Sequence, residues 1–435
     1  MGVASLLMSI DRRRFIRTAG IGAAASAGLL AACSDDDGAS VRPDDRDDDA
    51  VDSGAGSDGD AAAVGSVPSQ TFAFRGPHQA GVLAPPAAHG IVAAFDVRDE
   101  TRDELRETLR TLSDAAEQVM SGEAYEARAG GFPPYDTGIL GPEPGPTGTS
   151  IVIAFGDSLF DGRFGLADRK PVELQQMPSF LNDYLVREHR SHGDLAITVS
   201  ADTADAANHA LRQLMRVTRG RLSPRWQREG YNTLFESFGP GEAPTRNLMG
   251  FKDGSSNPDP GDEAVMNDVV WVQDGDGQPD WAVGGTYQAI RVIRMQVEFW
   301  DRTRLNEQEA IFGRRRSDGA PLGRDHETDD PDFATIDPDL ESHIARAHPR
   351  TPGSERNRIL RKGFNYSSGL DENDQLDQGL IFMAFQRSLE NGFMTVQRRL
   401  DGEVLEEYIR PLGGGFFFVP PAPEGDEFLG EHLLA

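Results

Sequence analysis

The pattern of apolar and polar residues predicts alternating strands and helices in the first half of the chain after residue 66. Three short runs rich in apolar and β-branched residues predict strands over 91–96, 147–155 and 194–200. Apolar residues three or four positions apart predict helices over 100–121 and 203–218. The order strand, helix, strand, strand, helix is typical of an α+β sandwich, and not of a doubly wound parallel sheet.

The second half of the chain shows a similar alternation of predicted strands and helices. Two strands, a broken helix and a last strand are predicted over 287–298, 376–386, 389–404 and 415–419. A duplicated α+β unit follows from this repetition, and Gly, Pro and Glu residues clustered at 237–245 indicate its boundary. We therefore expect an N-terminal domain over 67–240 and a C-terminal domain over 241–435.

The first 33 residues have the organisation of an export signal. A basic segment over 11–17 precedes an uncharged apolar run over 18–32. The pair Arg12-Arg13 resembles a twin-arginine signal, whose cargo crosses the membrane already folded. The run ends in Leu30-Ala31-Ala32-Cys33, which resembles a lipobox. We expect cleavage before Cys33 and a lipid on its thiol, with an amphipathic helix as the alternative interpretation.

Residues 34–66 are predicted to be a disordered acidic tether. Between Ser34 and Asp60 stand eleven Asp and two Arg, a net charge of −9, with almost nothing apolar to bury. Such a segment repels itself and stays extended.

Charge and cysteine content exclude several classes of function. The formal net charge of −28 makes non-specific binding to nucleic acid unfavourable. Only three of the 43 basic residues are lysines, Lys170, Lys252 and Lys362, which favours a protein kept soluble in concentrated salt, with GC-rich coding as the alternative. Because Cys33 is the single cysteine, disulfides and thiolate-rich metal sites within one chain are excluded. No apolar run reaches the length of about 18 residues expected of a spanning helix.

Three segments carry candidate chemistry, and each also has an ordinary structural interpretation. Asp253 stands in a turn-rich segment over 247–258, either as part of a surface loop or as a carboxylate projecting into a cavity past small neighbours. His343 and His348 lie on a helix predicted to end before Pro349, and the apolar neighbour Ile344 favours His343 as a ligand. Arg361 belongs either to a solvated basic stripe or to a strand that aims its guanidinium at a cavity.

From Gly76 to Pro420, the chain resembles the dye-decolourising peroxidases, and within them the exported deferrochelatase/peroxidase branch. The resemblance rests on several stretches in one order, which begin at Pro133, Ser158, Trp300 and Thr395. It implies an α+β fold of two ferredoxin-like domains with antiparallel sheets. It also implies one haem b per chain, held in the C-terminal half.

The resemblance also implies roles for individual residues. Asp253, in Gly250-Phe-Lys-Asp253-Gly254, would be the distal acid and base, and Arg361 the distal arginine. His343 would be the proximal iron ligand. The remaining residues that would line the haem are Gly254, Ser255, Ser256, His348, Pro349 and Arg350.

This sequence departs from the family pattern close to the proposed ligand. Ala345 and His348 stand where the family often has Arg and Asn, so His348 stays a rival ligand. A carboxylate on the far ring nitrogen would strengthen the ligand, and Asp377 is the candidate for it.

Three functions are compatible with these residues. The leading hypothesis is a haem peroxidase that reduces hydrogen peroxide through an oxoferryl intermediate and oxidises an electron donor. The second is a deferrochelatase that releases iron from haem for importer components, and the third is a non-catalytic haem-binding lipoprotein. The expected location is the outer face of the cytoplasmic membrane, the periplasm or the cell envelope, with a homo-oligomer as an open alternative to a monomer.

The lipid anchor can be tested by intact mass. Protein extracted from membranes should begin at Cys33 and carry the added mass of lipid on this residue. A Cys33→Ala variant should lose that mass and leave the membrane fraction. An unmodified Cys33 in the membrane-extracted wild type would contradict the prediction.

Overall fold

The computed structural model describes residues 70–234 and 242–435. The predicted signal peptide (1–33) and acidic tether (34–66) lie outside these residues, as does most of the predicted boundary at 237–245. None of the described helices combines the length and hydropathy needed to cross a bilayer.

The first half of the body has the five elements that the sequence predicts, in the predicted order, followed by a strand that was not predicted, β4 (Leu222–Tyr231). The five predicted elements are β1 (His89–Val97), α1 (Arg102–Ser121), β2 (Ser150–Gly156), β3 (Leu195–Ala201) and α2 (Ala204–Val217). The strands pair antiparallel in the order β4-β1-β3-β2, which is the ferredoxin-like arrangement. The predicted α+β class is therefore confirmed.

The second half repeats the arrangement with other connections. Its four main strands are β7 (Thr286–Met295), β9 (Phe364–Leu370), β10 (Leu376–Gln386) and β11 (Ile409–Val419). They pair antiparallel in the order β11-β7-β10-β9, so the first and third strands are again central. The short strand β8 (Leu360–Arg361) pairs with β10 beside β9.

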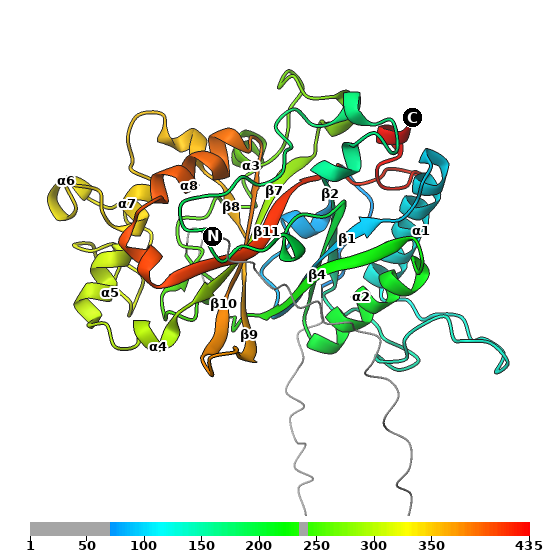
Figure 1. Cartoon of the computed structure of the whole chain (residues 1–435), viewed down its shortest axis with the longest axis horizontal. Coiled ribbons are helices and arrows are strands. Elements are labelled where there is room, and N and C mark those ends of the chain that lie inside the picture. The colour runs from blue at the N-terminus through cyan, green and yellow to red at the C-terminus, as the bar shows by residue number, and fades with distance from the viewer. Residues whose placement is uncertain (1–69, 235–241) are drawn as a thin grey trace, which may run out of the picture. The chain divides into compact units, whose positions relative to one another are not determined.

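The two sheets join at both edges. Phe417 and Phe418 of β11 pair with β2, and Tyr231 of β4 pairs with Asn365 of β9. The eight main strands of the described chain therefore form a continuous ring, closed by the pairing of β7 with β10. Strands β7, β10 and β11 of this ring lie near the centre of Figure 1. Its interior is filled by apolar side chains from both halves, among them Val92, Ala94, Ile290, Val292, Ile381 and Met383.

Different elements cover the outer faces of the two sheets. Helices α1 and α2 pack on the first sheet and bury one apolar stripe each, with Leu109 and Leu211 among the buried residues. Helix α1 begins at a capping box in which Thr101 and Glu104 bind each other's backbone N–H groups.

The second sheet is covered by short elements that leave a cavity against it. Between β7 and β8 lie α4 (Val297–Trp300), α5 (Leu305–Phe312), α6 (Phe333–Ile336) and α7 (His343–Ala347). Between β10 and β11, the predicted broken helix is confirmed as a π-turn and α8 (Thr395–Leu400), interrupted by non-helical backbone at Gly392. Before β7, β5 (Thr245–Arg246) and β6 (Lys252–Asp253) form a small hairpin, followed by α3 (Glu263–Val269).

A glycine at the junction of the two sheets gives a test of this arrangement. A Cβ atom on Gly90 of β1 would overlap the ring of Phe364 in β9. We expect Gly90→Ala to lower the free energy of unfolding by about 1–3 kcal/mol, because the overpacked ring must move. Urea denaturation measures this, with Gly162→Ala as the control, since nothing lies within 4 Å of a Cβ there. Equal stability of the two variants would contradict the expectation.

Candidate active site

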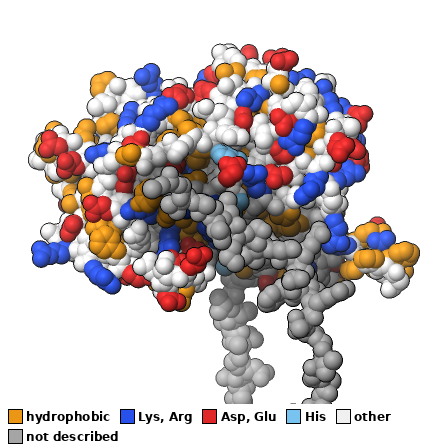
Figure 2. All heavy atoms as spheres, in the orientation of Figure 1, with side chains coloured by type: hydrophobic (Ala, Val, Ile, Leu, Met, Phe, Trp, Pro, Cys, Tyr) orange, Lys and Arg blue, Asp and Glu red, His pale blue; other side chains and the backbone are white. Residues whose placement is uncertain are grey.

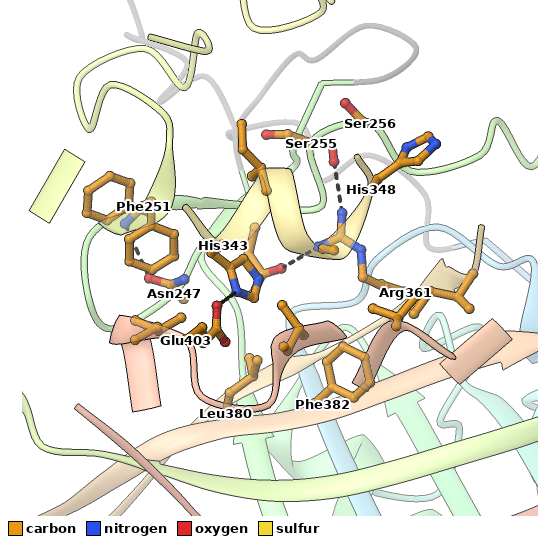
Figure 3. A pocket seen from close by; sticks show the side chains of 18 of the residues that line it. Asn247, Phe251, Ser255, Ser256, His343, His348, Arg361, Leu380, Phe382 and Glu403 are labelled. Carbon is orange, nitrogen blue, oxygen red and sulfur yellow. Dashed lines mark hydrogen bonds and ion pairs between the residues drawn. The ribbon is translucent and has the colours of Figure 1, made fainter. Parts of the chain in front are cut away.

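A cavity lies between the outer face of the second sheet and the short helices that cover it (Figure 3). Leu380 and Phe382 of β10 line it, whereas the intervening Ile381 faces the interior of the ring. Phe251 and Phe312, whose rings stack with centroids 4.0 Å apart, contribute apolar lining from other elements. The cavity therefore has broad apolar walls.

The charged side chains that line this cavity are mostly basic. Its acidic residues are Asp253, Glu403 and Glu406, and its basic ones are Lys252, Arg291, Arg314, Arg350, Arg358 and Arg361. On the outer surface, acidic and basic side chains are interspersed, as the face in Figure 2 shows. A net positive lining in a chain of net charge −28 suits a ligand with anionic groups.

His343 is the first residue of α7 and is held from two sides. Its neighbour Ser342 donates its hydroxyl to Asp337 at 2.6 Å. Gly313 follows α5 at φ +84° and packs closely against the start of α7. A Cβ atom added at Gly313 would lie only 2.7 Å from the side chains of Ile344 and Ser342. A glycine at this position therefore lets α5 and α7 pack against each other and fixes where α7 begins.

The imidazole of His343 is oriented by a buried carboxylate. Nδ1 lies 2.8 Å from Oε2 of Glu403, whose side chain is 3% exposed, and the contact is visible in Figure 3. Burial lowers the pKa of His343, but the adjoining Glu403 carboxylate outweighs this effect, so that the net shift of the pKa is upward. With Nδ1 bound to Glu403, Nε2 is the ring nitrogen left to bind a metal.

Glu403, and not Asp377, is therefore the carboxylate partner of His343. The sequence-based choice of Asp377 is wrong, because its carboxylate accepts a hydrogen bond from Tyr366 at 3.2 Å and lies 3.9 Å from Arg228. Glu403 follows α8, 60 residues after His343. No local motif links the two positions, so the sequence alone carried no signal for this contact.

His348 lies at the end of α7, and both of its ring nitrogens have charged neighbours. Nδ1 contacts the guanidinium of Arg350, and Nε2 lies 3.0 Å from Oε1 of Glu355. Burial, and then the charge of Arg350, lowers the pKa of His348. This geometry favours His343 over His348 as a metal ligand.

Asp253 and Arg361 meet at the same cavity. Nη1 of Arg361 lies 3.7 Å from Oδ1 of Asp253. Nη2 of Arg361 donates to the backbone oxygen of Ser255 at 2.8 Å (Figure 3). Asn257 anchors the backbone of Arg361 from both sides, accepting from its N–H at 3.0 Å and donating to its oxygen at 2.7 Å. The interpretation of Arg361 as part of a solvated basic stripe is therefore wrong.

A buried glutamate that the sequence analysis missed supports the segment after Asp253. Glu327, 5% exposed, accepts a hydrogen bond at 2.6 Å from the hydroxyl of Ser255 and pairs with Lys252. Arg314 donates to the backbone oxygen of Glu327 at 2.9 Å and to the hydroxyl of Ser256 at 3.1 Å. Burial lowers the pKa of Arg314 to about 10.

Most of the residues predicted for the site lie together. Those that line the cavity are Asp253, Ser255, Ser256, His343, His348, Arg350 and Arg361. Gly254, at φ +110°, lines an adjoining smaller cavity instead. Pro349 is not among the residues that line either one.

Comparison with known proteins identifies the class of protein that this fold and site define. The family model described as "Dyp-type peroxidase, N-terminal" matches residues 79–232, and the one described as "Dyp-type peroxidase, C-terminal" matches residues 244–424. The chain belongs to the Dyp-type peroxidase family. It is thus an oxidoreductase that acts on peroxide, in a family that depends on haem.

Individual relatives place the chain more closely. It is 45% identical to the deferrochelatase of Escherichia coli O157:H7 over 368 residues, which cover 83% of this chain and 86% of the relative. The deferrochelatase of Yersinia pestis is 43% identical over 367 residues, 83% of this chain and 84% of the relative.

Solved structures agree with this placement. DtpA from Streptomyces lividans, in an oxyferrous complex, is 34% identical with a TM-score of 0.76, covering 86% of this chain and 100% of that one. The Dyp-type peroxidase from Cellulomonas bogoriensis is 30% identical with a TM-score of 0.74, covering 84% and 98% of the two chains.

The buried ion pair under the Asp253 segment yields a prediction. We expect Glu327→Gln to lower the free energy of unfolding by about 3 kcal/mol, since Lys252 and its surroundings lose their anionic partner. The matched control is Asp318→Asn, which breaks the more exposed pair with Arg315 and should cost less than about 1 kcal/mol. Chemical denaturation compares the two, and equal losses would contradict a supporting role for Glu327.

Proposed function

We propose that this chain binds one haem b in the cavity, where His343 would bind the iron. The observation that carries the proposal is the presence of two pairs in one cavity, His343 with Glu403 and Asp253 with Arg361. The residues fit a haem in three respects. One imidazole is oriented by a carboxylate, the walls are apolar, and the basic lining suits the two carboxylates of the porphyrin.

Bound haem supplies the redox-active iron at which hydrogen peroxide is reduced. The carboxylate of Asp253 removes a proton from one oxygen of hydrogen peroxide and returns it to the other, which leaves as water. Arg361, 3.7 Å from Asp253, stabilises the negative charge that develops on the departing oxygen. Glu403 holds the His343 ring in place and increases its electron donation to the iron.

A second candidate function is the release of iron from haem with the porphyrin left intact. The identity of 45% to proteins named deferrochelatase favours it. In that case the product iron would pass to importer components. A non-catalytic haem-binding lipoprotein is the weakest alternative, because simple binding requires neither Asp253 nor Arg361.

We further propose that the chain is exported by the twin-arginine route and anchored by lipid on Cys33. The basic segment over 11–17 and the single cysteine at the end of the apolar run support this. The protein would then act outside the cytoplasmic membrane, on hydrogen peroxide and an electron donor present in that compartment.

Variants at the two pairs test the peroxidase. We expect Asp253→Asn and Arg361→Leu to retain haem but to react with peroxide about two to four powers of ten more slowly, because each removes a group that acts on the O–O bond. His343→Ala should fail to hold haem stably. Stopped-flow absorption of the haem-loaded chain in high salt, after one equivalent of peroxide, measures these rates.

Asp377→Asn is the matched control, because Asp377 is an aspartate that does not line the cavity. It should react at the wild-type rate. Wild-type rates in both Asp253→Asn and Arg361→Leu would refute the assigned roles. Growth of metal-free porphyrin fluorescence, with no spectral response to peroxide, would instead support iron release.

A further inference from the structure

A second, smaller cavity adjoins the site and shares residues with it. Asp253, Arg361, Leu380 and Phe382 line both cavities. The outer side of the smaller cavity is formed by residues that are only half-buried, among them Pro86, Asn232 and Pro244. It therefore extends from the Asp253–Arg361 pair to half-buried residues that do not line the main cavity.

Lys362 lines this second cavity and has no carboxylate partner among the described residues. Its Nζ donates to the backbone oxygens of Gly81 at 2.8 Å and of Ala84 at 2.7 Å. Lys170 and Lys252, in contrast, both form ion pairs. Burial without a compensating anion lowers the pKa of Lys362 to about 7. At neutral pH its amine can therefore both release a proton to water and take one up.

The same cavity contains an unsatisfied acceptor. Asn365 is 5% exposed and donates its amide to the backbone oxygen of Arg246 at 2.8 Å, while its Oδ1 has no protein partner. Buried polar atoms are as a rule satisfied by protein or by ordered water. A water molecule in the cavity would supply the missing hydrogen bond. The charged groups that face this space are Asp253, Arg246, Arg361 and Lys362.

When the electron donor supplies electrons alone, as ferrocyanide does, the stoichiometry of the reaction requires protons from solvent. Hydrogen peroxide, two electrons and two protons give two molecules of water. The proton that Asp253 moves between the two peroxide oxygens is not part of this uptake, because it starts and ends on the substrate. The two consumed protons must therefore arrive while the electron donor reduces the enzyme, when haem occupies the main cavity.

We propose that the second cavity holds a short chain of water molecules through which Lys362 passes solvent protons to Asp253. Lys362 releases a proton to the water chain and regains one from solvent at the outer side of the cavity, so its charge is restored in each cycle. Arg361 and Arg246 keep their protons and do not take part in the transfer. The proposal rests on the proposed peroxidase function, and it adds Lys362 to the residues that serve the reaction.

The titration of Lys362 can be measured without turnover. With three lysines in the chain, lysine labelled with ¹³C at Cε gives at most three NMR signals, which single Lys→Arg variants assign. In the haem-loaded chain, kept diamagnetic as the ferrous carbon monoxide complex, we expect the Lys362 signal to titrate near pH 7. The Lys170→Arg and Lys252→Arg variants identify the other two signals, so that the Lys362 signal can be followed alone. A Lys362 signal that does not titrate near pH 7 would overturn the proposal.

Kinetics separates proton transfer from a structural role. Lys362→Gln and Lys362→Arg both keep a donor for the Gly81 and Ala84 oxygens, but neither releases a proton at neutral pH. We expect both variants to react with one equivalent of peroxide at the wild-type rate. Their subsequent reduction by ferrocyanide should be slowed at least about tenfold, in line with the loss of a general acid.

The pH dependence and a control variant complete the test. In the wild type the reduction step should slow as the pH rises above 7, because Lys362 loses its proton, and in the two variants this dependence should vanish. Lys170→Arg should behave as wild type. Wild-type reduction rates in Lys362→Arg would overturn the proposal, whereas a wild type that does not respond to peroxide would overturn the proposed function instead.

Discussion

Backbone pairing between the two sheets is the constraint on which the rest of the structure depends. An unpaired sheet edge leaves a row of exposed N–H and C=O groups, and closure of the ring removes such edges from the eight main strands. Because β7 and β10 are the central strands of their sheet, they cannot shift without breaking pairs on both sides. Their outward side chains therefore form a rigid floor for the cavity.

The sequence predicted those helices whose apolar residues recur at helical spacing and those strands that form short apolar runs. Helices α1 and α2 and the buried strands β1, β2, β3 and β10 are examples. Strand β4 was not predicted, because polar and apolar residues mix along Leu222–Tyr231, one side of which is exposed. The extent of β11 was underestimated for a related reason: Pro411 and three successive glycines precede its apolar end, and a bulge there keeps them in the strand.

The residues of the candidate site also fall into two groups, those that the sequence indicated and those that only the structure revealed. Asp253, His343 and Arg361 lie within short segments of a chain that resembles one family over several stretches, so matching these segments to the family was enough to select them as candidates. Glu403 and Glu327 act through contacts that span 60 and 72 residues of sequence, to His343 and Ser255. Such contacts depend on how α7, α8 and the loops between them pack, and no periodicity or spacing within one segment contains that information.

The contact between His343 and Glu403 also bears on the order in which the protein is assembled. Helix α7, which begins at His343, has five residues, too few to be stable alone. Its first side chain is held by the carboxylate of Glu403, 60 residues later in the sequence. The residues that line the cavity reach from Asn182 to Pro411. A newly made chain can thus close the cavity only after Pro411 has been synthesised, so a group bound there would mark a chain made at least to that residue.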